Sequence, residues 1–156
     1  MRSLLALGVL LAIVAPAASA QRIGRICPDP AHRCAGPFRP FDITFDLPAG
    51  DVARASSASA PFWAVILHSA PRCRVSAELV ARAQREFPRR QVFADRFECE
   101  DEALVGYAGV DSAHAFLAVY AGTSRREATA LRDSLRAARA YPGANVRRLH
   151  AVLHHP

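Results

Sequence analysis

Four cysteines and six histidines are the residues of this 156-residue chain whose types could do covalent or metal chemistry. A cysteine thiolate beside a histidine base is a nucleophile, and Cys73 with His68 or His114 would provide such a pair. A zinc site needs three or four ligands that converge on one point. His150 and His154 lie four residues apart, which places them on one face of a strand but far from each other. We therefore expect exposed histidines, no catalytic residue and no metal ligand.

A short acidic run could bind a hard cation, but its spacing is not that of a calcium-binding loop. Its members are Glu98, Glu100, Asp101 and Glu102. We expect a solvated acidic turn there. The chain also lacks a glycine-rich phosphate loop, a serine nucleophile elbow and a histidine-glutamate metalloprotease motif. The sequence therefore predicts no cofactor, and it favours a binding module over an enzyme.

The first twenty residues have the pattern of a secretory signal peptide. Arg2 gives a positive start, Leu4 to Val14 is an apolar run, and the segment ends at Ala20 in a small-x-small motif. The apolar run is shorter than the roughly 20 residues that a membrane-spanning helix needs. The sequence predicts cleavage after Ala20 and a periplasmic or secreted chain, residues 21–156, without a membrane span.

All 20 basic residues are arginine, and they give the chain a formal net charge of +6. Guanidinium groups suit carboxylates and phosphates, so anionic partners are favoured. Many of these arginines lie between residues 72 and 96, namely Arg72, Arg74, Arg82, Arg85, Arg89, Arg90 and Arg96. Export and the absence of an aromatic RNA-binding motif argue against nucleic acid as the partner. The arginines predict a solvated face or a contact with anionic envelope polymers.

Prolines interrupt residues 21–61, so no long helix can form in this N-terminal segment. Residues 41–47 alternate between apolar and polar side chains, which predicts one strand with an apolar face. Leaving that face in water would cost free energy, so we expect the strand to pack on the domain that follows, beside one of its edge strands. Residues 50–60 carry small side chains and are predicted to be a mobile linker.

From residue 62 onward the periodicity is regular. A nearly continuous apolar run predicts a central first strand. Apolar residues at helical spacing predict an amphipathic helix that Pro88 stops. Ser124 and Glu127 form a capping-box pattern that predicts the start of a second helix. The predicted elements are strand 62–69, helix 75–87, strand 91–99, a long connection 100–114, strand 115–121, a helix between 124 and 141, and strand 145–154.

The order βαββαβ closes naturally as a four-stranded antiparallel sheet, strand order 4-1-3-2, with both helices on one face. The predicted fold class is α+β, a ferredoxin-like two-layer sandwich over residues 62–156 with an extra N-terminal strand. In this fold Cys73 and Cys99 reach the same edge of the sheet. An even number of cysteines in an exported chain favours disulfides. We predict two bridges, Cys73–Cys99 and, closing a small local loop, Cys27–Cys34.

Residues 117–128 resemble part of the sporulation-related repeat (SPOR) domain. Leu117 to Gly122 looks like the third strand and turn of that family, and Ser124 to Ala128 looks like the opening of its second helix. The pattern of residues 62–153 is similar as well. SPOR domains are exported bacterial modules that bind peptidoglycan glycan strands stripped of their stem peptides. The resemblance implies glycan recognition on the sheet face away from the helices, where rings stack on sugars and polar groups meet hydroxyls. The candidate ligand-binding residues are Trp63, His68, Tyr120, Arg148 and His150.

Two function hypotheses follow from the sequence. The first is an exported non-enzymatic binding module that recognises peptidoglycan glycan strands. The alternative is a disulfide-stabilised periplasmic protein-interaction or inhibitor domain that binds an envelope protein through an Arg-rich face, in a salt-sensitive manner. For Trp63 and Tyr120, ordinary packing in the strand core is the competing interpretation.

Overall fold

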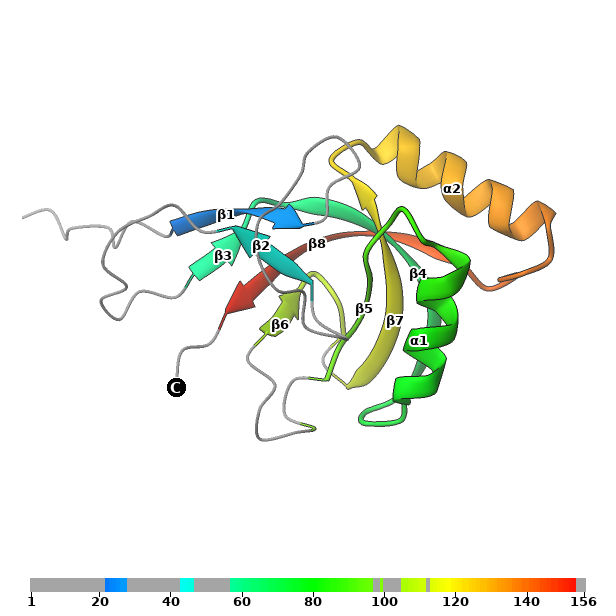
Figure 1. The fold of residues 1–156 in the computed structure, drawn as a ribbon, viewed down its shortest axis with the longest axis horizontal. Coiled ribbons are helices and arrows are strands. Elements are labelled where there is room, and N and C mark those ends of the chain that lie inside the picture. Colours follow the sequence, from blue (N-terminus) through cyan, green and yellow to red (C-terminus); the bar gives the residue numbers. More distant parts are fainter. Residues whose placement is uncertain are drawn as a thin grey trace, which may run out of the picture.

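The computed structural model describes residues 22–27, 43–46, 57–96, 99, 105–111 and 113–153. Two helices and a set of strands occupy these ranges (Figure 1). In chain order the elements are β1 (Arg22–Cys27), β2 (Thr44–Asp46), β3 (Ser57–Ser59), β4 (Phe62–Pro71), α1 (Ala77–Glu86), β5 (Val92–Ala94), β6 (Val105–Ala108), β7 (His114–Gly122), α2 (Arg125–Ala137) and β8 (Asn145–Leu153).

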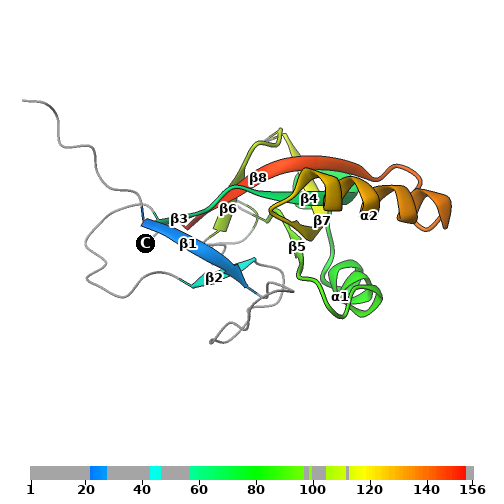
Figure 2. The same ribbon diagram turned by 90° about the horizontal axis from the view of Figure 1, so that it is seen from above.

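The described strands join into one hydrogen-bonded sheet in the order β2-β1-β3-β8-β4-β7-β5, with β6 also paired to β8. Only β1 and β3 are parallel among these pairs, and the sheet curls (Figure 2). The α+β class is therefore confirmed. The predicted order 4-1-3-2 recurs as β8-β4-β7-β5. The predicted layout of four strands plus one extra N-terminal strand is not confirmed, because β1, β2, β3 and β6 all extend the sheet.

β8 is the strand that the two parts of the sheet share. β3 and β4 follow each other along one edge of β8. At the end of β3, the Ser59 hydroxyl accepts a hydrogen bond of 2.9 Å from the Ala151 N–H of β8. Leu153 pairs with both Ser57 in β3 and Val105 in β6. Because a strand residue has one neighbour on each side, β6 covers the opposite edge of β8, which the four-stranded prediction left open.

One face of the central strands packs against both helices. Val65 and Leu67 of β4 belong to a buried cluster with Val80 and Ala83 of α1 and Ala128 of α2. β4 is apolar on both faces because alternate residues of a strand point to opposite sides and both sides are covered here. The prediction that both helices lie on one face is confirmed.

The opposite face of the sheet, which we call the helix-free face, is buried as well. It carries a cluster of aromatic rings whose neighbouring centroids lie 5.0 to 6.0 Å apart. Ile26 of β1, Ile43 beside β2 and Val105 of β6 pack against this cluster. The N-terminal strands and β6 therefore form a cover over most of the helix-free face. The rings are those of Phe62, Phe93, Tyr107, Phe116 and Tyr120.

Local signals explain where the helices begin. Ser76 caps α1, since its hydroxyl accepts a hydrogen bond of 3.3 Å from the Leu79 N–H. α2 begins directly after Ser124, as predicted, but the Ser124 side chain makes no cap hydrogen bond, so the predicted capping box is not formed. The Glu127 carboxylate lies instead over Gly122, 2.7 Å from where a Cβ would stand. Neither helix in the described part of the chain is long and apolar enough to span a membrane.

The N-terminal segment packs on the domain in part as predicted. Ile43 is 1% exposed, and its N–H donates a hydrogen bond of 3.1 Å to the Tyr107 hydroxyl. However, β2 pairs with β1 rather than directly with an edge of the predicted sheet. Residues 57–59, expected to belong to a mobile linker, form β3. Positions 1–20 and 50–56, the predicted signal peptide and the rest of that linker, lie outside the described residues.

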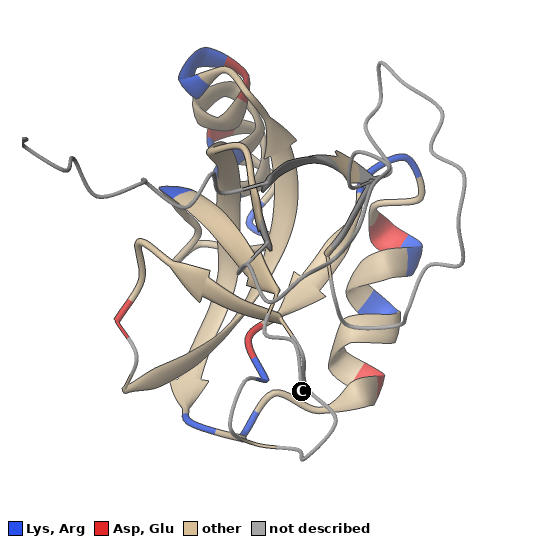
Figure 3. Cartoon of the chain, turned by 90° about the vertical axis from the view of Figure 1, so that its left-hand side faces the viewer, with Lys and Arg blue, Asp and Glu red and all other residues tan. Residues whose placement is uncertain are grey.

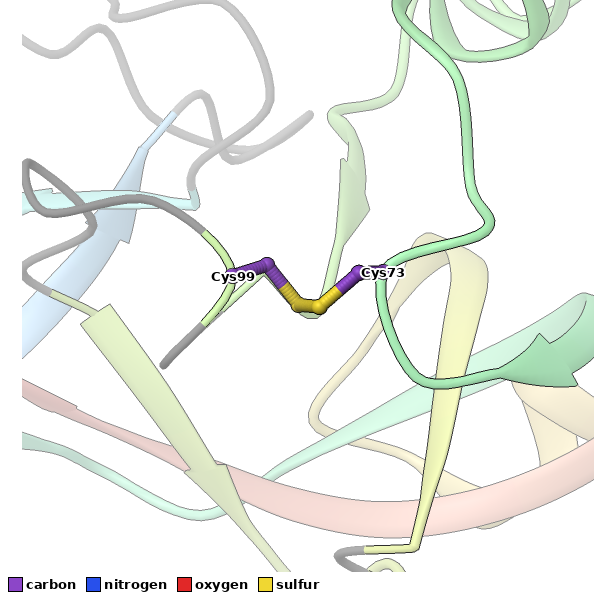
Figure 4. The surroundings of a disulfide bond; sticks show 2 residues. All are labelled: Cys73 and Cys99. Carbon is purple, nitrogen blue, oxygen red and sulfur yellow. A yellow bond between two sulfur atoms is a disulfide. The ribbon is translucent and has the colours of Figure 1, made fainter.

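A disulfide joins Cys73, in the turn after β4, to Cys99, with Cα atoms 5.3 Å apart (Figure 4). This bridge confirms one predicted pairing. Cys73 has a positive φ of 64° and sits in a turn closed by a hydrogen bond of 3.2 Å from the Arg74 N–H to the Pro71 carbonyl. The other predicted pairing involves Cys34, which lies outside the described residues.

Candidate functional site: a polar cleft on the helix-free face

The cover over the helix-free face stops short of one end of the sheet, and a cleft of about 290 Å³ opens there. Its apolar walls come from Ile66, Val110 and Phe116. Its polar walls come from the end of β4, the loop before β7, the start of β7 and the start of β8. The polar residues are Ser69, Asp111, His114, Asn145 and Arg147.

Sheet register explains why these residues share a face. Asn145 of β8 pairs with Ile66 of β4, whose side chain belongs to the buried cluster of the helix-free face. Ser69 of β4 pairs with Phe116 of β7, which belongs to the same cluster. Arg147 lies two residues after Asn145, so the two side chains lie on the same face of the strand.

A β-bulge decides which residue at the end of β4 reaches the cleft. Ile66 pairs with Ala118, but His68 pairs with the very next residue, Leu117. Leu117 packs on the helix side. An extra residue in one strand reverses the alternation of side chains beyond it. The bulge therefore turns Ser69, and not His68, to the helix-free face.

The loop before β7 holds a histidine and a carboxylate in contact. His114 Nδ1 lies 3.1 Å from Asp111 Oδ2, and the Ala113 N–H donates a hydrogen bond of 2.9 Å to Asp111 Oδ1. These contacts, chiefly the backbone N–H of Ala113, lower the pKa of the Asp111 carboxyl. An ionised carboxylate only accepts hydrogen bonds, so the Nδ1 atom carries the proton, and in the neutral ring Nε2 accepts.

Asn145 is the residue of the cleft whose hydrogen bonding is incomplete. Its Oδ1 is buried and, within the described part of the chain, has no hydrogen-bond partner. Buried polar atoms are nearly always paired, because burial without a partner costs about 1–3 kcal/mol. Asn145 therefore lines the cleft with an acceptor atom that is itself buried and unpaired.

The five residues singled out by the sequence do not form one surface. Trp63 packs on the helix side, with the Arg125 guanidinium 5.7 Å from its ring centroid, and Arg148 pairs with Trp63 in the register. His68 is exposed but pairs with a residue of the helix side. Tyr120 is 1% exposed within the aromatic cluster, so its ring cannot stack on a sugar. His150 is half-buried opposite Ala108 of β6.

Two residues of the cleft, Ser69 and Arg147, are direct sequence neighbours of the predicted His68 and Arg148. Arg148 and His150 on β8 were predicted to bind the ligand, whereas the cleft is lined by Arg147 and Asn145, whose side chains lie on the opposite face of the strand. His114 was considered only as a possible base or metal ligand. The signal that could have found the β8 residues is the buried Leu149, because residues two and four positions before it must share its face.

The cleft suits binding of a polar ligand. In the described residues no group of three or more His, Cys, Asp or Glu side chains could hold a metal ion. Cys73 is bonded to Cys99, so it supplies no thiolate for His114 to activate. Charged positions of the helices and the loops appear in Figure 3, where the strands themselves are mostly uncharged. The cleft therefore combines polar side chains with the apolar residues of the central strands.

Comparison with known proteins identifies no relative: no family model matches the chain, and neither the curated proteins nor the solved structures contain a significant match.

Proposed function

We propose that the chain is an exported, non-enzymatic binding module that recognises peptidoglycan glycan strands of the bacterial cell envelope. The leader pattern of residues 1–20 and the Cys73–Cys99 bridge support export. The resemblance of residues 117–128 to SPOR domains supports a glycan as ligand. We also propose that strands β8-β4-β7-β5 and the two helices form a ferredoxin-like unit, and that the other strands are additions to it.

The observation that carries the proposal is the cleft at the end of the helix-free face. A sugar ring has apolar C–H faces and a rim of hydroxyls. The cleft offers an apolar wall at Ile66, Val110 and Phe116, together with hydrogen-bonding groups at its rim. Small-molecule sites typically combine such a mainly apolar lining with a few placed polar groups. We therefore propose that a glycan binds in this cleft and not on an open sheet face, because the cover blocks most of that face.

Binding to purified sacculi, intact and amidase-treated, tests the proposal. Arg147 and Arg148 provide a matched pair of variants, because both are exposed, adjacent in sequence and on opposite faces of β8. We expect Arg147→Ala to weaken binding to sacculi about tenfold and Arg148→Ala to leave it within twofold. Absence of sacculus binding by the wild-type chain would overturn the proposal. A loss with Arg148→Ala alone would move the site to the helix side.

The second candidate is a periplasmic protein-interaction or inhibitor domain. The observation that favours it is the exposure of arginines on the helices, for example Arg82 and Arg85 of α1 and Arg126 and Arg136 of α2. Rim charges of this kind mainly set association rate and salt dependence. Charge reversal at Arg82 and Arg85 should abolish a salt-sensitive protein complex and leave sacculus binding unchanged if the first proposal holds.

A further inference from the structure

β8 has a stretch of edge that no described strand covers. It pairs with β3 and β4 along one edge, and β6 pairs with residues 150–153 along the other. After β6 the chain leaves that second edge at Gly109, which lies against the Arg148 carbonyl. Within the described residues, the second edge is therefore unpaired from Asn145 to Arg148, and we call this stretch the open edge. Figure 2 shows β8 along one border of the central strands.

Hydrogen-bond directions show which backbone groups the open edge presents. The Ala151 N–H donates to Ser59, towards β3, whereas the Arg148 carbonyl faces Gly109, on the side of β6. The backbone groups of successive strand residues point to alternate edges, so those of Val146 point the same way as those of Arg148. The open edge thus presents the Val146 N–H and C=O and the Arg148 N–H. Unpaired groups of this kind are a template for an added strand.

The side chains of the open edge carry positive charge on both faces of the sheet. Arg147 and Arg148 are exposed, and neither forms an ion pair with another described residue. Arg148 lies on the helix side opposite Trp63, and the exposed Arg125 lies over the Trp63 ring. On the helix-free face, Arg147 shares the cleft with Asp111, so their formal charges cancel. The helix side of the open edge is therefore the more cationic side.

These charges select the partner. A second copy that paired through the same edge would bring the arginine pairs of both copies together, and like charges opposite each other destabilise a strand pair. A strand with acidic residues opposite Val146 and Arg148 would instead place carboxylates beside guanidinium groups on the helix side. The residue between them would face the mouth of the cleft, where a neutral side chain fits. Glu127, an acidic residue on the helix side, lies over Gly122 of β7, two strands further in.

We infer that the open edge of β8 binds an extended acidic segment of another protein as an additional antiparallel strand, with acidic residues at alternate positions and a neutral residue between them. The added strand would continue the line of β6, which is antiparallel to β8 on the same edge. In this mode backbone hydrogen bonds supply affinity and side chains supply specificity. The inference goes beyond the proposed function and does not depend on the glycan, because it concerns backbone groups and helix-side charges.

A short acetylated and amidated peptide, Thr-Glu-Val-Glu-Thr, is the probe, and Thr-Lys-Val-Lys-Thr is its matched control. NMR titration of the mature chain, residues 21–156, would measure both dissociation constants. We expect the acidic peptide to bind about tenfold more tightly or better. Arg148→Glu should reverse this preference. Arg85→Glu should leave it unchanged, because Arg85 lies on α1, which packs beside β5 at the far end of the central strands.

Backbone methylation tests the strand addition itself. In an antiparallel pair the residues opposite Val146 and Arg148 exchange hydrogen bonds with β8, so N-methylation of the two peptide glutamates should abolish binding. The N–H of the peptide valine points away from β8, and its methylation should change the affinity by less than about threefold. On the protein side, Val146→Pro removes a donor at the open edge. Edge strands tolerate proline where the N–H faces outward, so this variant should fold and bind the acidic peptide about tenfold more weakly or worse.

Several results would overturn the inference. They are equal affinity for the acidic and the lysine peptide, unchanged binding after methylation of the glutamates, and loss of binding after methylation of the valine alone, which would refute the antiparallel direction. Amide hydrogen exchange gives a further measurement on the wild-type chain. The Val146 and Arg148 amides should exchange fast in the free chain and slowly in the complex, and slow exchange of both in the free chain would show that the edge is already occupied. Sacculus binding without binding of the acidic peptide would refute this inference and leave the proposed function standing.

Discussion

Replacing Gly109 by alanine should destabilise the fold more than any other glycine-to-alanine change tested at the described loops. Gly109 follows β6 and has a φ of +96°, and a Cβ there would stand 2.5 Å from the backbone carbonyl oxygen of Arg148. A left-handed backbone costs a side-chain-bearing residue about 1–2 kcal/mol. Forcing the backbone of β8 aside adds about 1–3 kcal/mol of overpacking. The expected loss in the free energy of unfolding is about 2–5 kcal/mol.

Gly143 provides the matched control, because a Cβ there would meet nothing within 4 Å. Gly143→Ala should stay within about 1 kcal/mol of the wild type, and it could gain stability by restricting the unfolded chain. Urea unfolding measures both variants. At roughly 4 °C per kcal/mol for a chain of this size, Gly109→Ala should also lower the Tm by about 8–20 °C. Equal stability of the two variants would refute the assignment of a strained, crowded turn at Gly109.

Three further predictions concern other parts of the fold. The Gln84 amide donates to the Phe87 and Arg90 carbonyls and accepts from the Val92 N–H. Gln84→Leu should therefore lower the free energy of unfolding, measured in urea, by about 1.5–4 kcal/mol. An unchanged free energy of unfolding would show that water replaces these bonds. Two double variants without the disulfide test the turn at residue 73. The variant Cys73→Gly/Cys99→Ser should be about 1 kcal/mol more stable than Cys73→Ser/Cys99→Ser, because φ at residue 73 is positive and glycine tolerates it. Equal Tm values would argue that the turn relaxes. Burial and the bond to Glu86 raise the pKa of Tyr141 to about 12. Because an unfolded tyrosine titrates near 10, this stabilisation is complete below about pH 10 and is lost as the pH rises towards 12; an ultraviolet pH titration against Tyr141→Phe would show the late phenol, and its absence would refute the shift.

Periodicity and local signals allowed most of the residue 62–153 unit to be predicted. The apolar runs determine which segments are strands, and Pro88 follows the end of α1 as predicted, whereas its N-cap Ser76 was not singled out from the sequence. The order of the four main strands follows from the sequence order and the preference for short connections. The Cys73–Cys99 bridge then follows from that order, because it places the two cysteines at one edge.

The additional strands were not predictable in the same way. β1 contains Gly24 and alternates poorly, and β6 is only four residues long inside an otherwise irregular connection. Both form because tertiary partners supply their hydrogen bonds: β6 pairs with β8, and β1 pairs with β2 and β3. Pairing with distant segments leaves little trace in local propensity.

The cleft residues depended on a still finer detail. One bulge between Ile66 and His68 reverses which side chains of β4 face the cleft. A one-residue change of register moves every later side chain to the other face. No residue type in this stretch marks the bulge, so Ser69 could not be preferred to His68 from the sequence. On β8 the alternation could have been inferred from Leu149, which places Arg147 on the face of the cleft and Arg148 on the other face.

Energetics explain why a glycan would use the end of the helix-free face rather than its middle. Burying a phenyl-sized side chain is worth roughly 1.5–3 kcal/mol, so the five clustered rings together contribute on the order of 10 kcal/mol. Binding with a dissociation constant between 1 mM and 1 μM supplies about 4–8 kcal/mol. A ligand of that affinity cannot displace β6 and the N-terminal strands to reach the rings. The ligand can bind only where the cover leaves the helix-free face open. Among the described residues, that open part is the cleft lined by Asp111 and Arg147.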